Sequence, residues 1–500
     1  MQPYLLLQAI VVPLIGAAVC YPAARRLGKN TGWLAFLFIL VSTLVLAVWA
    51  APQISGAAAV TESYPWAPTA GLEFNLSADG LSFPVLMLVN VVLAATAVYS
   101  VPYMSARVKS LKGEDDLAKH GMYYLNFLLV SSGLAGIVLS TNLIELYLFL
   151  EMVLIPTFVI ISLYGYVNKE RVATIYIIWN QLGAFVFLAG IALVYVATGS
   201  FSYSAVTAAQ ASPYAFWIAG LILLGWLVKM AVFGVHMWLP ITEAEPPTSF
   251  APTMAVVSGI GTYVIVRLLL LGMPLTFHSF SLPLMAWAVI TMFYGGALTL
   301  AQNDAKYLFA WSTMSQNAYS VLGLASLSAL GAAGSVFYFS SHILGKFVMF
   351  SVAGILLTQT GLRDIRKMGG LAAKMPLTAT LFVLGALILS AVPPTSGFQA
   401  EWIMFAGIFS PAASGSSSYL LVAFLGLAAT MLTVAYAFWP VKRIFFGELA
   451  PDLDSVKDPP LTMTLPLLAV VAVSIAVGIF PDLVSKFLFG LGGLLPGGAP

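Results

Sequence analysis

Long apolar runs recur along the whole length of this 500-residue chain. Most of them have about 20 residues, the length that an α-helix needs to cross the hydrocarbon core of a membrane. Hydrophobic residues make up 60% of the chain and charged residues 8%, whereas a soluble domain carries about 25% charged residues. The runs are continuous and lack the alternation of a membrane β-barrel. The sequence therefore predicts an all-α integral membrane protein.

The apolar pattern predicts fourteen membrane spans. The span 377–410 is too long for one plain helix and contains the stretch AVPPTSG, which predicts two half-helices. The seventh span ends in prolines, at Pro240, Pro246 and Pro247, which we expect to interrupt it. The predicted spans cover residues 4–22, 33–51, 81–101, 122–140, 143–164, 172–196, 214–240, 250–272, 284–302, 307–327, 332–358, 377–410, 419–440 and 461–480.

The positive charges are distributed unevenly between the connections. The chain has 21 Lys and Arg residues, and seventeen of them lie in alternate connections. Cytoplasmic connections of membrane proteins carry such an excess, so these connections are predicted to face the cytoplasm. An even number of spans then places both termini on the non-cytoplasmic side of the cell's inner (plasma) membrane. The connection 52–79 has no Lys or Arg, as expected of an outside loop.

The order of the spans suggests an internal repeat. Spans 4–8 begin on the cytoplasmic side and spans 9–13 on the other side, and each set has a broken helix in fourth place. Two inverted five-helix repeats are therefore predicted, with ion sites near the broken helices at the membrane midplane. The predicted units are residues 1–119 with spans 1–3, residues 120–275 and 276–445 with the two repeats, and residues 446–500 with span 14 and the tail.

Four charged residues lie in the middle of predicted spans, where each costs roughly 2.5–3.5 kcal/mol to insert. They are Glu151 in span 5, Lys229 in span 7, Lys346 in span 11 and Glu401 after the break in span 12. Glu151 and Lys229 could form a static ion pair that locks two helices, although desolvation offsets the attraction in such a pair. The alternative is a pair that switches the lysine between its charged and neutral states. Four buried charges spread along the chain favour a proton relay.

Two histidines accompany the lysines. His236 is expected two helical turns after Lys229, on nearly the same face, and His342 lies one turn before Lys346. Histidine can pass protons near neutral pH, but a packing role remains equally open for both. Polar residues in spans 6, 8 and 10, such as Asn180, are expected to make interhelical hydrogen bonds.

Other charges lie near the ends of the spans. Glu145 is expected to be solvated at the outer end of span 5. Glu243 and Glu245 follow span 7 on the cytoplasmic side, where proton uptake and plain solvation are both open. Arg267 lies near the outer end of span 8 and is expected to be structural, with its long side chain reaching toward water.

The sequence carries no other recognisable chemistry. It has no phosphate-binding glycine loop, no His/Cys metal spacing and no catalytic triad pattern. The single cysteine, Cys20, can neither form an internal disulfide nor hold an iron–sulfur cluster. We therefore expect no redox cofactor and no metal in this chain, and no binding of nucleic acid.

Five stretches together resemble the antiporter-like subunits of respiratory complex I, a family that also includes subunits of multi-subunit sodium/proton antiporters and membrane-bound hydrogenases. The resemblance covers about residues 75–445. Its motifs are LYLFLEMVLIPTFVIISLYG, LVKMAVFGVHMWLPITEAEPPTS, NDAKYLFAWSTMSQN, SSHILGKFVMFSVAG and PPTSGFQAEW.

This resemblance implies roles for the buried charges. It makes Glu151 and Lys229 the proton-switching pair and places Lys346, with His342 before it, at the lysine of span 11. Most antiporter-like members have a lysine at the last charged position of span 12, whereas the M-type subunit (mitochondrial chain 4) has a glutamate. Glu401 therefore makes the chain similar to the M-type.

The sequence departs from the family pattern at two places. Members often have a lysine in span 8 before G-T-Y, where this chain has Gly259. Span 7 usually continues W-L-P-D-A-H, where this chain has Trp238 to Glu243 in the order W-L-P-I-T-E. The first departure removes a central relay group, whose role must then pass to Lys346, to His342 or to water.

The resemblance implies a non-redox, proton-translocating membrane-arm subunit of a complex I-like oxidoreductase. The assembly would be a translocase, a quinone or phenazine reductase driven by NADH, ferredoxin or a deazaflavin. The alternative is a subunit of a sodium/proton antiporter or a membrane-bound hydrogenase. The expected partners are other membrane subunits of the assembly, the lipid bilayer and protons, with sodium as the alternative ion.

Overall fold

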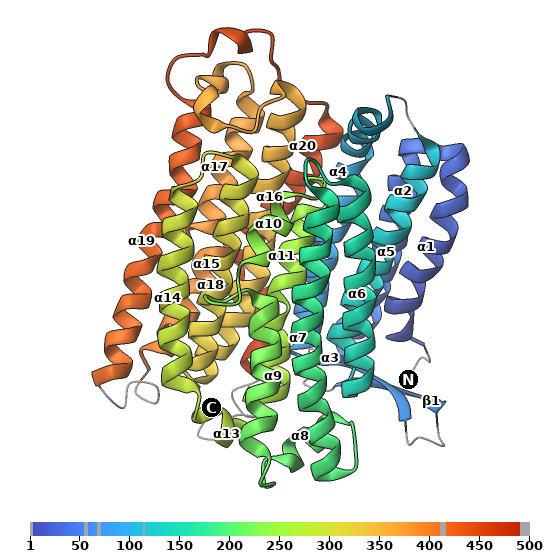
Figure 1. Cartoon of the computed structure of the whole chain (residues 1–500), viewed down its shortest axis with the longest axis vertical. Helices are drawn as coiled ribbons and strands as arrows, with labels where there is room; N and C mark the ends of the chain where they lie inside the picture. The colour runs from blue at the N-terminus through green and yellow to red at the C-terminus, as the bar shows by residue number, and fades with distance from the viewer. Residues whose placement is uncertain (1–3, 55–58, 68–71, 114–115, 411–416, 491–500) are drawn as a thin grey trace.

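The structure is a computed structural model that describes residues 4–54, 59–67, 72–113, 116–410 and 417–490. Most helices run side by side along the long axis of the molecule and form one bundle (Figure 1). The long helices are α1 (Leu7–Leu27), α2 (Thr31–Val45), α4 (Ser82–Lys112), α5 (Leu117–Leu139), α6 (Leu143–Tyr164), α7 (Lys169–Thr198), α14 (Ser281–Leu300), α15 (Ala305–Ala325), α16 (Ala329–Thr360), α19 (Ser417–Phe445) and α20 (Leu461–Ile479).

Shorter elements complete the bundle and its ends. They are the π-helix η2 (Leu46–Ala50) with α3 (Ala51–Ile54), α8 (Tyr203–Ala209), α9 (Ala215–Met230), α10 (Trp238–Ala244), α11 (Ala251–Gly259), α12 (Gly261–Ile265) with the π-helix η4 (Val266–Leu270), α13 (Pro274–His278), α17 (Pro376–Leu389), α18 (Ser396–Ile408) and α21 (Ser485–Leu488). Strands β1 (Val60–Ala67) and β2 (Leu72–Ala78) pair antiparallel, a hairpin that the sequence did not predict.

Length and hydropathy confirm the membrane class of the fold. Ten helical stretches of the described residues are long and apolar enough to cross a membrane, and α9 and α17 are shorter apolar helices. Many large apolar side chains at the surface are exposed, as lipid-facing residues are. The count of fourteen spans, the inverted repeat and the four predicted units remain predictions.

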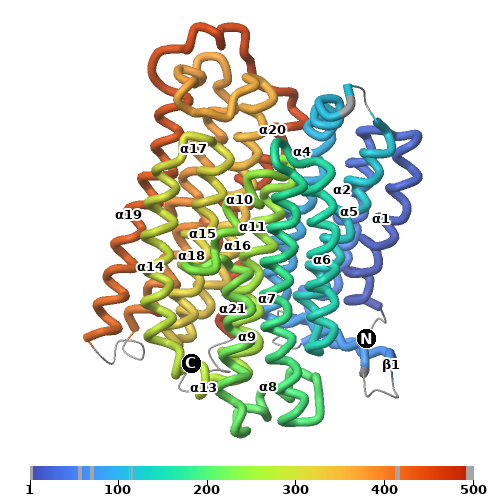
Figure 2. The backbone as a smooth tube through the Cα atoms, in the orientation of Figure 1, coloured from blue at the N-terminus to red at the C-terminus, as the bar shows by residue number. Residues whose placement is uncertain are grey.

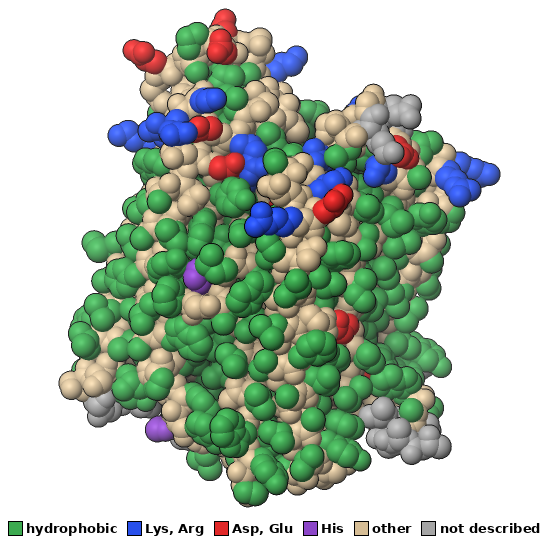
Figure 3. Space-filling view, in the orientation of Figure 1, with side chains coloured by type: hydrophobic (Ala, Val, Ile, Leu, Met, Phe, Trp, Pro, Cys, Tyr) green, Lys and Arg blue, Asp and Glu red, His purple; other side chains and the backbone are tan. Residues whose placement is uncertain are grey.

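Charged side chains gather at one end of the molecule. Lys and Arg side chains lie at the upper end of the face in Figure 3, whereas most side chains on the rest of that face are apolar. The connections that carry these charges lie at the same end in Figure 1, and the β1–β2 hairpin and α8 lie at the opposite end. We call these the basic end and the hairpin end. The chain termini, residues 1–3 and 491–500, lie outside the described residues.

The seventh predicted span is broken, but not where its prolines predicted. Helix α9 ends at Met230, and Ala231 has the left-handed φ of 58°. A non-helical segment, 231–237, separates it from α10, so the break precedes Pro240. That proline lies in the first turn of α10, where a missing backbone N–H costs nothing. The break therefore begins two residues after Lys229.

The twelfth predicted span is also broken, as the AVPPTSG stretch predicted. Helix α17 ends at Leu389 and α18 begins at Ser396. Ala391 in this break has a φ of 53°, which resembles the conformation of Ala231 in the first break. Both breaks leave backbone groups at helix ends without intrahelical partners inside the bundle.

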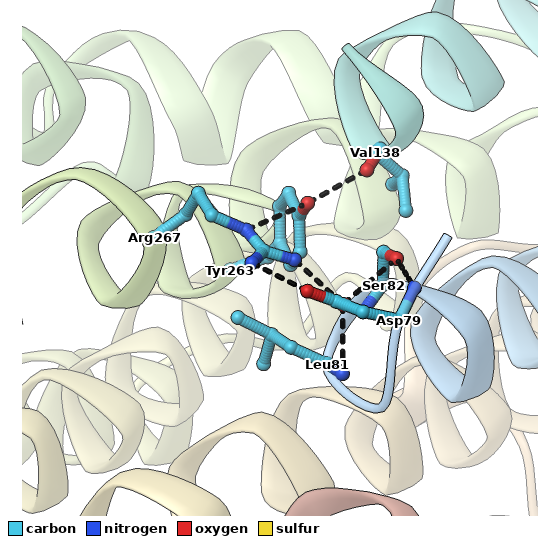
Figure 4. A network of polar contacts seen from close by, with 6 residues as sticks. All are labelled: Asp79, Leu81, Ser82, Val138, Tyr263 and Arg267. Carbon is cyan, nitrogen blue, oxygen red and sulfur yellow. Dashed lines mark hydrogen bonds and ion pairs between the residues drawn. The ribbon is translucent and has the colours of Figure 1, made fainter. Parts of the chain in front are cut away.

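The hairpin end is tied to the bundle by an ion pair (Figure 4). Arg267, in η4, donates through two guanidinium nitrogens to the carboxylate of Asp79, each at 2.7 Å, and also donates to the Tyr263 hydroxyl. Tyr263 in turn donates to the carbonyl of Val138 on α5. The Arg267 side chain is 18% exposed, so it pairs with Asp79 at the protein surface instead of extending alone toward water.

Helices α15 and α16 lie in the middle of the bundle. In the tube drawing (Figure 2) they lie with α10 and α11 between α19 and α14 on one side and α6, α5, α2 and α1 on the other. Helix α15 packs against α10, α14 and α16. It is also rich in polar side chains that are nearly or fully buried, and these connect the predicted site residues.

Candidate functional site

Lys229 lies in the last turn of α9, next to the helix break. Its side chain is buried, and its Nζ donates one hydrogen bond of 3.4 Å to Oδ1 of Asn180 on α7. The C-terminal end of a helix carries partial negative charge, which attracts an ammonium group. The break therefore places the lysine where the backbone favours its charge.

The carbonyl groups freed by the break are bound by other side chains. Trp238 donates through Nε1 to the carbonyl of Val228 at 2.9 Å. Asn317 of α15 donates to the carbonyl of Met230 at 3.1 Å and to the Ser258 hydroxyl at 3.2 Å. The end of α9 is thereby connected to α15 through a single amide side chain.

Glu151 lies in α6 and is half-buried. Its Oε1 accepts a hydrogen bond of 3.2 Å from Nε2 of Gln181, the neighbour of Asn180 on α7. Glu151 attracts Lys229 electrostatically, but no ion pair joins the two among the described residues. Two adjacent amides of α7 thus hold the carboxylate and the lysine.

Lys346 is fully buried in the middle of α16. Its Nζ donates to the carbonyl of Phe309 at 2.6 Å and to the hydroxyl of Ser312 at 2.5 Å, both on α15. The group is therefore surrounded by polar atoms inside the bundle and does not face lipid.

Glu243 lies in α10 and is fully buried, so plain solvation, one of the two interpretations of this residue, is wrong. Both of its carboxylate oxygens are buried, and no donor of the described residues lies in hydrogen-bonding geometry to either of them. Lys346 attracts the carboxylate, and the Thr313 hydroxyl lies near it. Sequence reasoning kept proton uptake open for Glu243 but did not count it among the buried charges of the relay, although its place in the altered W-L-P motif was a signal.

Two other carboxylates are buried as well. Glu245 is 4% exposed, and its Oε1 accepts hydrogen bonds from the backbone N–H groups of Val167 and Asn168. Glu145 is 1% exposed and accepts a hydrogen bond of 2.7 Å from the backbone N–H of Asn75. The expectation of a solvated Glu145 is wrong because the β2 strand folds over it.

The two histidines lie in different environments. His236 is in the non-helical segment after α9, so the predicted shared helical face with Lys229 is wrong. It stacks on Phe233, and Tyr294 and Trp311 surround it. His342 lies one turn before Lys346 on α16, is 3% exposed and interacts electrostatically with that lysine. The geometry favours packing for His236 and keeps His342 near the relay.

Glu401 lies in α18, one turn after the second break, and is half-buried. Three buried tyrosines, Tyr319, Tyr338 and Tyr436, interact with it electrostatically. Their hydroxyl groups form a network with one amide: Tyr338 donates to Gln316 at 2.7 Å, and Gln316 donates to Tyr436 at 2.6 Å.

Helix α15 connects this tyrosine network to the lysine. Ser312, which binds Lys346, lies one helical turn before Gln316, and Tyr319 follows one turn later. Hydroxyl and amide groups at this spacing provide hydrogen-bonding positions from Lys346 toward Glu401. The signal for this stripe was present in the sequence, but polar residues of that kind usually serve helix packing.

Gly259 is at the place where the family resemblance predicts a lysine in span 8. A Cβ atom built there would lie 2.7 Å from the Phe339 ring, so the ring occupies the space that a side chain would need. No charged group replaces the lysine at that position. The Oδ1 atom of Asn317 would lie 3.3 Å from the same Cβ atom, and the Asn317 amide donates to the Ser258 hydroxyl.

Carboxyl, amine and imidazole groups of this kind can accept and release protons. Ionisable groups and hydrogen-bonding side chains alternate through the middle of the bundle, from Glu151 on α6 to Glu401 on α18. Among the described residues, no group of three or more His, Cys, Asp or Glu side chains could hold a metal ion.

Comparisons with known proteins agree with one another. The family described as "NADH:quinone oxidoreductase/Mrp antiporter, TM" matches residues 140–434. A Na(+)/H(+) antiporter protein from Alkalihalophilus pseudofirmus is 29% identical over 97% of this chain and 61% of its own length. An NAD(P)H-quinone oxidoreductase chain 4 from Thermosynechococcus vestitus is 28% identical over 95% of this chain and 89% of its own. Subunit M of the F(420)H(2) dehydrogenase from Methanosarcina mazei is 28% identical over 90% and 89%.

Solved structures show the same fold. A chain of the Mrp complex from Dietzia sp. DQ12-45-1b aligns with a TM-score of 0.84 at 22% identity, covering 98% of this chain and 97% of that one. A chain of respiratory complex I from Thermus thermophilus aligns with a TM-score of 0.82 at 23% identity, covering 98% and 100%.

Proposed function

Because the chain belongs to the NADH:quinone oxidoreductase/Mrp antiporter transmembrane family, we propose that it translocates protons as a non-redox membrane subunit of a complex I-like oxidoreductase. As a multi-pass membrane protein, it works within an assembly of other membrane subunits. The redox partners supply the driving force, and this chain supplies the path for protons. The complex lies in the cell's inner membrane, and the basic end of this chain faces the cytoplasm.

One observation carries the proposal: the bridged pair of Glu151 and Lys229 beside a broken helix. A buried lysine is held by a single hydrogen bond and attracted by a carboxylate that does not contact it. At an effective dielectric constant of about 20, opposite unit charges 4 Å apart attract each other by about 4 kcal/mol, and this attraction weakens as the two groups separate. Movement of either group therefore changes whether the lysine holds its proton.

The remaining relay residues extend the path in both directions. We place Lys346 and the polar stripe of α15 between Lys229 and Glu401, because Asn317 of α15 donates to the carbonyl of Met230, the neighbour of Lys229, and Ser312 of α15 binds Lys346. Glu401 stands at the position that marks the M-type subunit, and two relatives are named as chain 4 and as subunit M. We assign the terminal proton-carrying position to Glu401.

The experiment uses membrane vesicles from cells that contain the chain in its own assembly. NADH, reduced ferredoxin and the reduced deazaflavin F420 are tested in parallel as electron donors, and acidification is followed with a pH-sensitive fluorescent dye. The donor-driven, uncoupler-sensitive signal is expected to disappear in Lys229→Met and to persist in Lys486→Met, a control at an exposed lysine. Normal acidification by Lys229→Met, at equal chain content, would contradict the proposal.

The second candidate function is sodium/proton antiport without redox partners. It is favoured by the antiporter relative from Alkalihalophilus pseudofirmus, which aligns with 97% of this chain. In the same vesicles, a proton gradient is formed by an ATP-driven pump and sodium is then added. Sodium-dependent collapse of that gradient, without any donor-driven signal, would establish the antiporter function instead.

A further inference from the structure

Glu243 is a buried carboxylate for which the relay described above has no use. It is fully buried in α10, and no donor of the described residues lies in hydrogen-bonding geometry to its two oxygens. An isolated buried carboxylate costs several kcal/mol in its charged form. The buried Glu243 side chain must therefore either lie near a positive charge or carry a proton.

The charged neighbour of Glu243 is Lys346. The two groups attract each other across the contact between α10 and the α15–α16 pair, with the Thr313 hydroxyl of α15 beside the carboxylate. The other titratable side chain near Lys346 is His342, one turn earlier on α16. Glu243 and Lys346 thus form a second acid–lysine pair, in which the lysine ammonium is already hydrogen-bonded to α15.

The two departures from the family pattern lie on α10 and α11, two consecutive helices that contact each other. Glu243 stands where the related W-L-P-D-A-H motif has its histidine, and Gly259 stands where related sequences have a lysine. The Phe339 ring that fills the space at Gly259 comes from α16, seven residues before Lys346. One proton-carrying group has been lost in the centre, and one carboxylate has been gained next to Lys346.

Glu243 also lies close in sequence to an opening at the basic end. A pocket of about 200 Å³ is lined by Ile241 and Glu245 of α10, by Arg171 of α7 and by Tyr307 of α15, among other residues. Glu243 lies between Ile241 and Glu245 in the same short helix. The pocket reaches the helix that carries the carboxylate from the side that faces the cytoplasm.

We propose that Glu243 carries protons between this pocket and Lys346, and that this second acid–lysine pair replaces the central lysine that is missing at Gly259. The proton leaves the protonated Glu243 carboxyl and binds the neutral Lys346 amine, which gives a carboxylate and an ammonium. Lys346 then passes the proton on toward the α15 stripe, and a proton taken up from the pocket binds the Glu243 carboxylate, which returns the pair to its first state. This inference rests on the proposed function and assigns to it a place of proton uptake.

The test compares Glu243→Gln with Glu145→Gln in the vesicle assay described above. Both residues are buried glutamates, and glutamine preserves their shape, but Glu145 lies at the hairpin end and contacts neither lysine. Glu243→Gln is expected to lose acidification at least tenfold, since a missing proton-transfer group typically costs 10²–10⁴-fold in rate. Acidification by Glu145→Gln is expected to stay within about twofold of that by the native chain, because glutamine has nearly the same shape and volume as the glutamate that it replaces.

A double variant separates a proton-carrying role from a packing role. If Glu243 and Lys346 act as one unit, the double variant Glu243→Gln with Lys346→Met is as active as the less active of the two single variants. If Glu243 only packs, the two losses multiply. Glu243→His restores the residue type of the related motif, and it is expected to assemble and recover part of the signal.

The outcomes distinguish this inference from the proposed function. Normal acidification by Glu243→Gln, with acidification lost in Lys229→Met, overturns the inference alone. Normal acidification by both variants overturns the proposed function as well. If the Glu243→Gln chain fails to assemble, Glu243→Asp and Glu243→Leu take its place: partial activity in Glu243→Asp with none in a well-assembled Glu243→Leu supports a role in proton transfer, and full activity of both overturns it.

Discussion

The two buried lysines are held in opposite ways. Lys229 ends a helix, two residues before a left-handed alanine, and makes a single long hydrogen bond to Asn180. Lys346 lies in the middle of the unbroken α16 and makes two short hydrogen bonds to α15. The first lysine can change position when the broken helix moves, whereas moving the second requires breaking two bonds inside a packed bundle.

Their carboxylates differ in the opposite sense. Glu151 is half-buried and accepts a hydrogen bond from Gln181. Glu243 is fully buried, and no donor of the described residues lies in hydrogen-bonding geometry to its carboxylate. The lysine with one long hydrogen bond is thus paired with a carboxylate that accepts a hydrogen bond from an amide, and the lysine with two short hydrogen bonds is paired with a carboxylate that has the Thr313 hydroxyl beside it. In each pair, one side chain is held in place by hydrogen bonds and the other is freer to change its position.

The largest effects are expected when either lysine becomes arginine. Arginine keeps the positive charge but does not release its proton in proteins, so Lys229→Arg and Lys346→Arg should both abolish donor-driven acidification. The comparison predicts a difference in stability. Lys346→Arg should also lower the melting temperature of the solubilised assembly, because the larger guanidinium must enter a fully buried site.

The control for this prediction is Lys486→Arg at the exposed end, where neither activity nor melting temperature should change. Equal destabilisation by the two buried substitutions would show that the two lysine sites are packed alike. Retained acidification in either one would show that the lysine concerned need not lose its proton.

The next effect concerns Glu401, at the far end of the path. Glu401→Gln keeps shape and hydrogen bonding but cannot ionise, so it should assemble normally and lose most proton translocation. Glu401→Asp should retain part of it. Acidification at equal chain content measures both, and a normal signal from the glutamine variant would make Glu401 a packing residue and remove the terminal site of the relay.

Much of this site could be predicted from the sequence. A charge in an apolar run is conspicuous because its insertion is costly, and Lys229, Lys346 and Glu401 were found in that way. The break after α17 was also predictable, because adjacent prolines within an apolar run cannot continue a helix. These signals are local, so no knowledge of neighbouring helices was needed.

Other parts depended on contacts between distant segments. Pro240 predicted the break in the wrong place, since proline is tolerated in the first turn of a helix and the chain turned earlier, at Ala231. The burial of Glu243 and Glu145 follows from elements that fold over them. The hydropathy of a segment does not show whether another segment packs over it. Both residues lie at the ends of apolar runs, where side chains are usually solvated.

A smaller effect is expected from the polar groups that hold the lysines. Asn180→Leu removes the one hydrogen bond of Lys229, whereas Ser312→Ala leaves Lys346 with the carbonyl of Phe309. A hydrogen bond to a charged group contributes about 1.5–3 kcal/mol, which corresponds to roughly a tenfold or larger change in proton affinity. Acidification should therefore fall more in Asn180→Leu than in Ser312→Ala.

The pH dependence of acidification provides the second measurement for these two variants. The profile should shift in Asn180→Leu and stay close to the native profile in Ser312→Ala. The reverse order would mean that Lys346, and not Lys229, is the lysine whose protonation depends on a single contact. Asn180→Asp, which keeps an acceptor at the same place, should restore a lysine contact and indicates whether the loss came from packing.

The smallest effect on transport is expected at the Asp79–Arg267 pair, which contacts neither lysine. Burial raises the pKa of Asp79, but the charge and hydrogen bonds of Arg267 and the hydrogen bonds of Ser82 outweigh it and lower that pKa from 3.8 to about 2. The difference corresponds to about 2 kcal/mol of stability. Since the pKa is lowered in the folded chain, this stability is present above pH 3.8 and is lost as the pH falls toward 2.

Asp79→Asn should therefore lower the melting temperature of the solubilised assembly at pH 7, and the gap to the native chain should shrink as the pH is lowered below 3.8. Acidification should stay within about twofold at equal chain content, because surface ion pairs of this kind stabilise structure without carrying the transported proton. Glu73→Gln, at a carboxylate of the same hairpin that is far more exposed, provides the control and should change neither quantity. If Asp79→Asn abolished acidification while the melting temperature stayed unchanged, the hairpin end would belong to the proton path, and the two lysine sites would no longer account for it alone.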